Sequence, residues 1–172
     1  KREGIEADTV LDITLYVIIS AIIGARLFYV VQFFHEFRGN LIEVFAIQYG
    51  GLVFYGGLIL ALAAVLWRAK VYKLSLLKVF DVATPSALLG YSIARIGCFL
   101  NGCCYGIVTR FPLALKFQNL PGLRHPTQLY ASITIFLFFL VIMFLWSKKK
   151  FDGQIFLSGL ILYSAYRFLI EF

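Results

Sequence analysis

The feature that most limits how this chain can fold is a series of five long apolar stretches. A helix needs about 20 apolar residues to cross the hydrocarbon core of a bilayer. Five stretches reach or approach that length: residues 10–34, 51–67, 79–100, 129–146 and 154–172. Of the 172 residues, 61% are hydrophobic and 15% are charged, whereas soluble domains are roughly half apolar and a quarter charged. We therefore expect an all-α, polytopic transmembrane helical bundle that forms a single domain over residues 1–172.

The basic residues outside these stretches predict how the chain is oriented. Nine of them lie before the first stretch, between the second and third, or between the fourth and fifth, and four lie in the segments on the other side. The positive-inside rule places the more basic side in the cytoplasm. The N-terminus of this chain is then cytoplasmic and the segment 101–128 faces outward. The net charge of +7 is explained by this topology, so we expect no nucleic-acid partner.

Three arginines lie inside the apolar stretches, namely Arg26, Arg95 and Arg167. Each comes late in a stretch that runs outward, so all three are expected at a similar depth in the outer half of the bilayer. A single arginine there can extend its charged end to the interface. Three at matching depth favour an interior site for a membrane-bound anion. Guanidinium groups suit phosphate oxygens, which makes a phospholipid headgroup the expected ligand.

Other polar groups and glycines are expected on the same outer side. Tyr55, Gly56 and Gly57 lie in "VFYGGL", Asn101 follows the third stretch, and His125 and Gln128 lie in "RHPTQLY". Each has a structural explanation as well: the glycines can permit helix contact, the tyrosine can belong to an interfacial aromatic belt, and the histidine can be a loop residue. As a set on one side of the membrane, they are candidates for substrate binding.

Five motifs together resemble those of a known family. In order and spacing, "GARLFYV", "GGLVFYGGL", "ARIGCFLNGCCYG", "HPTQLY" and "YSAYRFLIEF" are similar to the motifs of prolipoprotein diacylglyceryl transferases. The resemblance implies transfer of a diacylglyceryl group from phosphatidylglycerol to the lipobox cysteine thiol of a prolipoprotein, at the outer face of the bacterial cytoplasmic membrane and without a cofactor. Members typically have seven transmembrane helices, so this chain is expected to lack the first and the last.

The resemblance also implies roles for individual residues. Arg95 matches the signature arginine and Arg167 the arginine of a late "YxxxR" motif, so both are expected on the phosphate, with Tyr55 near the reacting thiol. The expected substrate-binding residues are Arg26, Gly56, Gly57, Asn101, Gly106, His125, Gln128, Tyr163 and Glu171.

The chain departs from the family pattern at several polar positions. Many members carry histidine where this chain has Tyr55, and a phenol is a poor base at neutral pH. Cys98 and Cys103 replace an asparagine and a glutamate of the signature, and Ala131 replaces a glutamate after "HPTQLY". These losses leave an alternative open: a non-catalytic paralogue that binds or transports an anionic lipid in an outward-facing arginine cavity.

The three cysteines, Cys98, Cys103 and Cys104, lie within seven residues. Soft ligands of this kind can bind zinc, but their spacing is not that of a paired C-x-x-C site. An odd number so close together also argues against a disulfide framework. We expect small apolar fillers at the end of a helix and no metal.

Overall fold

The computed structural model describes residues 4–37, 39, 41–46, 50–117 and 120–171. The chain divides into two compact units, Lys1–Leu76 and Leu77–Phe172, and each is described by itself. Within the described residues, the regular structure is helical apart from two isolated β-bridges, Val108 with Arg124 and Leu115 with Arg124. The expected all-α fold is confirmed.

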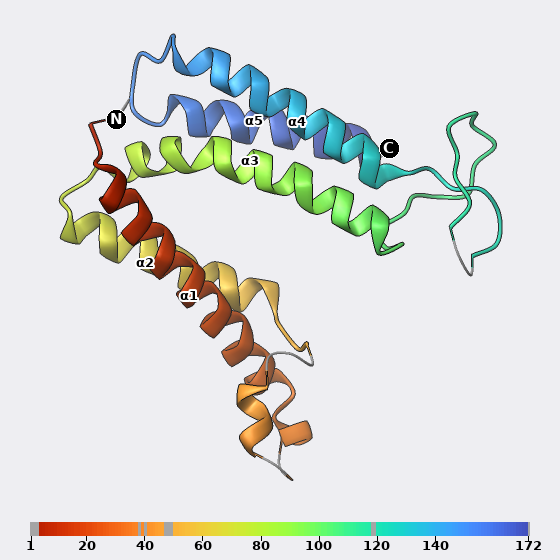
Figure 1. The fold of residues 1–172 in the computed structure, drawn as a ribbon, viewed down its shortest axis with the longest axis horizontal. Helices are drawn as coiled ribbons and strands as arrows, with labels where there is room; N and C mark the ends of the chain where they lie inside the picture. The colour runs from red at the N-terminus through yellow and green to blue at the C-terminus, as the bar shows by residue number, and fades with distance from the viewer. Residues whose placement is uncertain (1–3, 38, 40, 47–49, 118–119, 172) are drawn as a thin grey trace. The chain divides into compact units, whose positions relative to one another are not determined.

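The first unit is a pair of antiparallel helices (Figure 1). α1 spans Ala7–Gln32 and α2 spans Phe54–Val71, and the connection between them contains two 3-10 helices, η1 (Phe34–Phe37) and η2 (Leu41–Phe45). At one end of the pair, the Asp12 carboxylate accepts hydrogen bonds from Arg68 and from the Tyr72 hydroxyl. The Arg68 guanidinium also lies 4.3 Å from the centre of the Tyr16 ring. This polar cluster joins the beginning of α1 to the end of α2.

Small residues let α1 and α2 approach each other closely. A Cβ added at Gly24 would collide with the carbonyl oxygen of Gly56, and a Cβ at Gly56 would collide with that of Gly24. A Cβ at Gly57 would lie 2.9 Å from the carbonyl oxygen of Ala21. Small residues at such a contact allow membrane helices to pack backbone against backbone. The geometry thus supports the helix-contact explanation for Gly56 and Gly57.

Replacing Gly56 with alanine should therefore destabilise the first unit. The added methyl group has to displace the neighbouring backbone, and overpacking of this kind costs about 1–3 kcal/mol. Gly90→Ala is the matched control, because Gly90 also lies in a helix and a Cβ there would meet no atom within 4 Å. Denaturant unfolding of the full chain in detergent micelles, followed by circular dichroism, measures both variants. A Gly56→Ala midpoint equal to that of Gly90→Ala would rule out the packing role.

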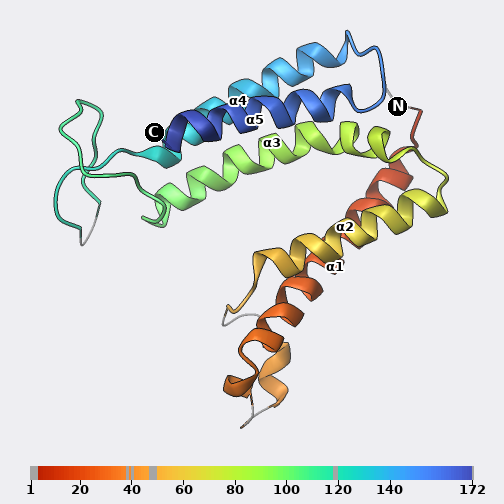
Figure 2. The ribbon, with the colours of Figure 1, turned by 180° about the vertical axis from the view of Figure 1, so that it is seen from behind.

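The second unit contains three helices that lie side by side in both views (Figures 1 and 2). They are α3 (Leu76–Leu100), α4 (Thr127–Trp146) and α5 (Gln154–Glu171). The buried Ser92 hydroxyl of α3 donates a 2.8 Å hydrogen bond to the carbonyl oxygen of Ser132 in α4. Around this contact the core is apolar, and its buried members are Leu88, Ala131, Ile135, Ile142, Ile155 and Tyr166.

The beginning of α5 is capped by a carboxylate that α3 supplies. Asp81 is fully buried, and its two oxygens accept hydrogen bonds from the backbone N–H groups of Gly153 (2.7 Å) and Phe156 (2.8 Å). The first N–H groups of a helix have no partner within it, and its dipole favours negative charge there. The Lys149 ammonium lies 2.9 Å from the same carboxylate, so the buried charge of Asp81 is both paired and hydrogen-bonded.

Removing this carboxylate should strongly destabilise the second unit. Asp81→Ala leaves Lys149 without the buried partner and the start of α5 uncapped, and losing one member of a buried pair costs about 3–5 kcal/mol. Asp81→Asn keeps an acceptor oxygen and should lose less. Unfolding of the full chain in detergent micelles gives the three midpoints. Asp152→Asn, at the partly exposed second partner of Lys149, is the control and should cost about 1 kcal/mol or less; equal losses for Asp81→Ala and Asp152→Asn would contradict the capping role.

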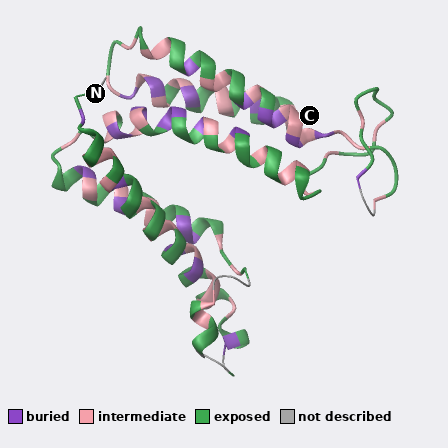
Figure 3. Ribbon diagram, viewed as in Figure 1, coloured by how far each residue is buried: buried purple, intermediate pink, exposed green. Residues whose placement is uncertain are grey.

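Much of the surface of the helices is exposed (Figure 3). Large apolar side chains are among the exposed residues, for example Ile133, Leu137 and Phe144 on α4. α1, α2 and α4 are long and apolar enough to cross a membrane, and α5 is apolar over the shorter segment Gln154–Ile170. The chain is therefore a membrane protein. Among the described helices, α3 and α5 fall outside that group, so the expectation of five spans in one domain stays a prediction.

The helix ends lie within four residues of the apolar stretches expected from the sequence. The largest difference is at the end of α2, which continues through Arg68 and Lys70 to Val71. Basic residues in the last turn of a helix interact favourably with its dipole. A helix can therefore extend beyond its apolar part into a charged turn, which hydropathy alone does not predict.

Candidate active site

Two tyrosine–arginine pairs lie toward the C-terminal ends of α3 and α5. In each pair the tyrosine precedes the arginine by four residues, Tyr91 with Arg95 and Tyr163 with Arg167, a spacing that puts both side chains on one helix face. Arg95 donates a hydrogen bond to the Tyr91 hydroxyl, and its guanidinium lies 4.9 Å from the centre of that ring. The Tyr91 and Tyr163 rings meet edge to face with their centres 5.7 Å apart, which joins the two pairs.

Arg95 and Arg167 both lie near the same tyrosine hydroxyls. Both guanidinium groups interact electrostatically with the hydroxyls of Tyr163 and Tyr166. Tyr166 is buried in the core, Arg95 is half-buried and Arg167 is exposed. Two planar cations with several donors each, beside phenolic hydroxyls, form a site suited to the oxygens of a phosphate. Of the three arginines expected at one depth, the second unit thus brings two into one neighbourhood.

α3 ends in a backbone motif that explains the "NGC" of the sequence. The N–H of Gly102 donates to the carbonyl oxygen of Phe99, and the N–H of Cys103 donates to that of Cys98, both at 3.1 Å. This pair of bonds is a Schellman motif, which needs a left-handed residue just after the helix. Gly102 provides it with a φ of 69°, a conformation that glycine adopts without steric cost.

The three cysteines are free and lie together at this helix end. Their sulfur atoms all lie within 4.8 Å of one another. The Cys103 sulfur lies 3.6 Å from the carbonyl oxygen of Cys98 and 3.6 Å from the Cys104 sulfur. The hydrogen bond between the thiols of Cys103 and Cys104 lowers the pKa of Cys103 and raises the pKa of Cys104.

The segment after α3 is tied to the beginning of α4. The fully buried Gln128 side chain donates through Nε2 to the carbonyl oxygen of Cys103 (2.5 Å), and Thr127 Oγ1 donates to that of Cys104 (2.9 Å). The N–H of Gly106 donates to the carbonyl oxygen of His125 at 2.9 Å, and a Cβ at Gly106 would lie 2.8 Å from Thr127 Cγ2. In this arrangement Gln128 and Gly106 hold the segment in place.

The imidazole of His125 has an aromatic environment. Its Nδ1 lies 3.3 Å from the Tyr130 hydroxyl, and its ring centre lies 5.6 Å from that of Phe111. A hydroxyl partner on one ring nitrogen fixes the orientation of the ring and influences which nitrogen carries the proton.

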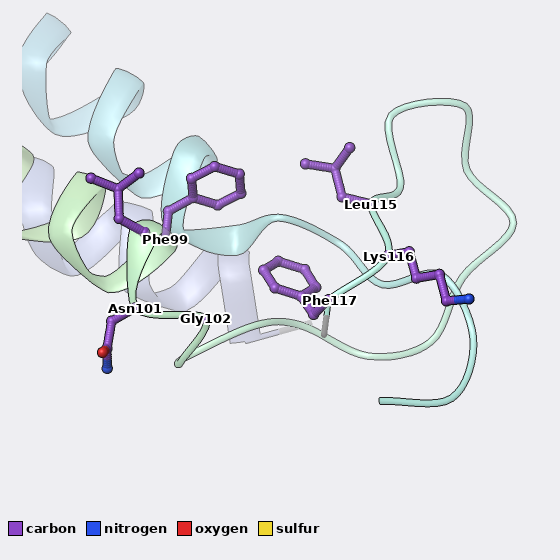
Figure 4. Close-up of a pocket in the computed structure, with 7 residues that line it drawn as sticks. Phe99, Asn101, Gly102, Leu115, Lys116 and Phe117 are labelled. Atoms are coloured by element: carbon purple, nitrogen blue, oxygen red, sulfur yellow. The ribbon is translucent and has the colours of Figure 1, made fainter. Parts of the chain in front are cut away.

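Asn101 lines an open pocket beside the end of α3 (Figure 4). The pocket has a volume of about 660 Å³ and is lined by Phe99, Leu100, Asn101, Gly102, Leu115, Lys116 and Phe117. The Phe99 and Phe117 rings meet edge to face with their centres 6.1 Å apart. The pocket therefore combines aromatic surface with one amide and one cation.

In the first unit, Arg26 is occupied by its own chain. It is buried, and it makes five hydrogen bonds to backbone carbonyl oxygens, those of Glu43, Val44, Ala46, Gly50 and Gly51, at 2.5–3.4 Å. An arginine has five N–H donors, so each has a carbonyl partner. The guanidinium also lies 5.3 Å from the centre of the Phe37 ring. This geometry makes Arg26 the organiser of the α1–α2 connection and leaves it no N–H for the expected headgroup contact.

The remaining expected residues are Tyr55 and Glu171. Tyr55 lies in the first turn of α2, is 70% exposed, and meets Phe54 edge to face with the ring centres 5.7 Å apart. Glu171 ends α5, but its side chain lies outside the described residues. Four of the expected residues belong to the first unit, namely Arg26, Tyr55, Gly56 and Gly57, and the other expected residues belong to the second.

Sequence reasoning missed Tyr91, Tyr166 and Asp81. A signal for Tyr91 was present, because "YSIAR" in α3 and "YSAYR" in α5 repeat the same tyrosine–arginine spacing. Asp81 was visible as a carboxylate inside an apolar stretch. Its partners Lys149, Gly153 and Phe156 are about 70 residues away, and no local pattern points to them.

The comparisons with known proteins agree over the whole chain. The sequence model of one family, described as "Prolipoprotein diacylglyceryl transferase", matches residues 1–172. The chain belongs to this family. Three relatives are named phosphatidylglycerol–prolipoprotein diacylglyceryl transferase. The one from Finegoldia magna is 39% identical over 99% of this chain and 68% of its own length. The one from Clostridium botulinum strain Langeland is 39% identical over 95% and 68%, and the one from Clostridium kluyveri strain ATCC 8527 is 34% identical over 99% and 70%.

The family motifs fall on defined places in this transferase fold. The signature "ARIGCFLNGCCYG" covers the last turns of α3 and its Schellman cap, and "YSAYR" lies in α5. Tyr91, three residues before the signature, contacts Tyr163 of "YSAYR" and so brings the two segments together. The resemblance stated from the sequence is therefore confirmed at the level of the family.

Replacing Arg26 with alanine should loosen the α1–α2 connection. Five carbonyl oxygens lose their donor at once, so we expect faster proteolysis between Glu43 and Gly51, by about tenfold if the variant costs about 1.4 kcal/mol of local stability. Limited proteolysis of the full chain in micelles with mass-spectrometric detection measures the rate. Arg110→Ala, at an exposed arginine of the second unit, is the control. An unchanged cleavage rate for Arg26→Ala would exclude the organising role.

Proposed function

We propose that this chain transfers the diacylglyceryl group of phosphatidylglycerol to the thiol of a lipobox cysteine in a prolipoprotein, and that Arg95 and Arg167 bind the phosphate. The reaction is that named for its relatives. The observation that carries the assignment of residues is the contact between the two tyrosine–arginine pairs. It supplies two cations to one neighbourhood on separate helices.

The chemistry of the transfer calls for such a pair. The acceptor thiol loses its proton, and its sulfur forms a bond to the glyceryl carbon that carries the phosphate ester. The carbon–oxygen bond breaks, and glycerol phosphate leaves with the electron pair. Negative charge therefore grows on the phosphate in the transition state, where donors already in position stabilise it without rearranging. In this proposal Tyr91 orients Arg95 through its hydroxyl, and Tyr163 links the second arginine's helix to Tyr91 through their ring contact.

The acceptor side involves different residues. Tyr55 lies near the reacting thiol and orients a group there, and His125, whose Nδ1 faces the Tyr130 hydroxyl, contributes the imidazole on that side of the membrane. Asn101 contacts substrate from the wall of its pocket. In the first unit, Gly56 and Gly57 keep α1 and α2 in contact and Arg26 orders the α1–α2 connection. In the second unit, Gly106 and Gln128 hold the segment after α3.

The proposed setting follows from the charge pattern. The basic segments face the cytoplasm under the positive-inside rule, so the two arginines and the segment 101–126 lie at the outer face of the bacterial cytoplasmic membrane. The lipid donor reaches the site within the bilayer. The lipobox cysteine reaches it at the membrane surface, where the signal peptide of the prolipoprotein ends.

The test is a transfer assay with the full chain in lipid nanodiscs, labelled phosphatidylglycerol and a lipobox peptide. We expect a thioether product, and we expect Arg95→Ala and Arg167→Ala each to lower kcat by about 10²–10³-fold, the loss typical of one charge-stabilising donor. Arg110→Ala should keep full activity. Unfolding midpoints for each variant separate loss of chemistry from loss of fold.

The outcomes of these assays distinguish the proposed transferase from the non-catalytic alternative and test the assignment of the phosphate site. Lipid binding by the wild-type chain without thioether formation would support the non-catalytic alternative. Full activity in both arginine variants would overturn the assignment of the phosphate site. Arg95→Lys should recover only part of the rate, because an ammonium keeps the charge but loses the two parallel donors of a guanidinium.

A further inference from the structure

Three thiols converge at the end of α3, and the proposed transfer reaction uses none of them. Cys98 comes from the last helical turns, Cys103 from the cap that follows, and Cys104 is the next residue after that cap. Every pair of the three sulfur atoms lies within 4.8 Å, and Cys103 and Cys104 are separated by 3.6 Å. The sequence spacing alone did not predict this convergence, because the Schellman turn folds Cys103 back over Cys98.

The sulfur separations match those around a thiolate-bound metal. A zinc–sulfur bond is about 2.3 Å long, which places tetrahedral ligands about 3.8 Å apart. The observed sulfur atoms therefore need shifts of about 1 Å or less to surround one ion. Thiolates select soft, thiophilic cations such as Zn²⁺ and Cu⁺ over Mg²⁺ or Ca²⁺.

Helix capping accounts for only two of the three thiols. A Schellman motif normally brings together the side chains that Cys98 and Cys103 occupy. Cys104 lies outside that contact and is exposed, with a φ of 61° that is unfavourable for a residue with a Cβ. Thr127 holds this backbone through the Cys104 carbonyl oxygen, and Gln128 holds the carbonyl oxygen of Cys103. The third sulfur is thus held beside the other two by contacts that packing at the cap does not require.

The surrounding charges are compatible with a cation held by three thiolates. The C-terminal end of α3 carries the negative end of the helix dipole, which favours a bound cation. Three thiolates and one divalent ion leave a single negative charge, and Arg95 lies within electrostatic reach of the Cys98 and Cys104 sulfurs. Within the described residues, the cluster of possible ligands contains these three cysteines only, so the fourth position of a tetrahedral ion is left to water or to a group from outside.

We infer that Cys98, Cys103 and Cys104 form a three-thiolate site for one thiophilic metal ion at the cap of α3. The inference does not rest on the transferase activity, and its readout is metal binding. It replaces the expectation that the cysteines serve only as small fillers.

The test is metal binding by the full chain in detergent micelles after reduction of all thiols. We expect one Zn²⁺ per chain by elemental analysis, and a sulfur-to-metal charge-transfer band when Co²⁺ is the probe. Cys104→Ser is the principal variant, because Cys104 is exposed and lies outside the helix cap. It should weaken Zn²⁺ binding by at least about 100-fold, beyond the 10–100-fold that changes around the ligands cause, with helicity unchanged by circular dichroism.

A matched control separates this site from adventitious metal binding. His35→Ala removes an exposed imidazole of the first unit and should leave Zn²⁺ affinity unchanged. Cu⁺ competition against Zn²⁺ should displace the ion, in keeping with thiolate ligation. Zn²⁺ retained by Cys104→Ser, no Co²⁺ charge-transfer band in the reduced wild type, or a Cys103–Cys104 disulfide with no metal bound after its reduction would each overturn the inference.

Discussion

The carboxylate of Asp81 is the interaction on which the geometry of the second unit depends. It fixes the beginning of α5 against α3 through the N–H groups of Gly153 and Phe156. From this point the two helices run in parallel, and Asp81 precedes Arg95 by the same 14 residues as Gly153 precedes Arg167. At 1.5 Å per residue, both arginines lie about 21 Å along the helices from the cap. A contact at one end of the helices thus sets the relative height of two cations at the other.

The sequence predicted the helices well and the role of each polar residue less well. Apolar length determines where a membrane helix can lie, so α1 to α5 were found within four residues of their ends. Hydropathy also identified Arg95 and Arg167 as charged residues inside apolar stretches, a position that requires a structural or functional explanation. It could not distinguish them from Arg26, because the difference lies in the carbonyl groups that only the folded α1–α2 connection brings to that guanidinium.

The departures from the family pattern also look different in the folded chain. From the sequence, Cys98 and Cys103 are losses of an asparagine and a glutamate near the presumed headgroup site. In the structure they are the two side chains that a Schellman motif places in contact, one turn beyond Arg95. In this chain both positions carry thiols, and the backbone between them forms the complete Schellman motif. The motif depends on the left-handed conformation of Gly102, which needs no polar side chain.

The five hydrogen bonds of Arg26 have a consequence for where the lipid surface can lie. At membrane depth, non-helical backbone is tolerated only where it is buried in protein or lines a water-filled cavity, because its carbonyl and N–H groups need hydrogen-bond partners. A single helix-borne guanidinium supplies such partners to five carbonyl groups between Glu43 and Gly51. These five carbonyl groups can then lie below the lipid headgroups without water as their hydrogen-bond partner. On this side of the protein, the membrane boundary therefore need not coincide with the residues at which α1 ends and α2 begins.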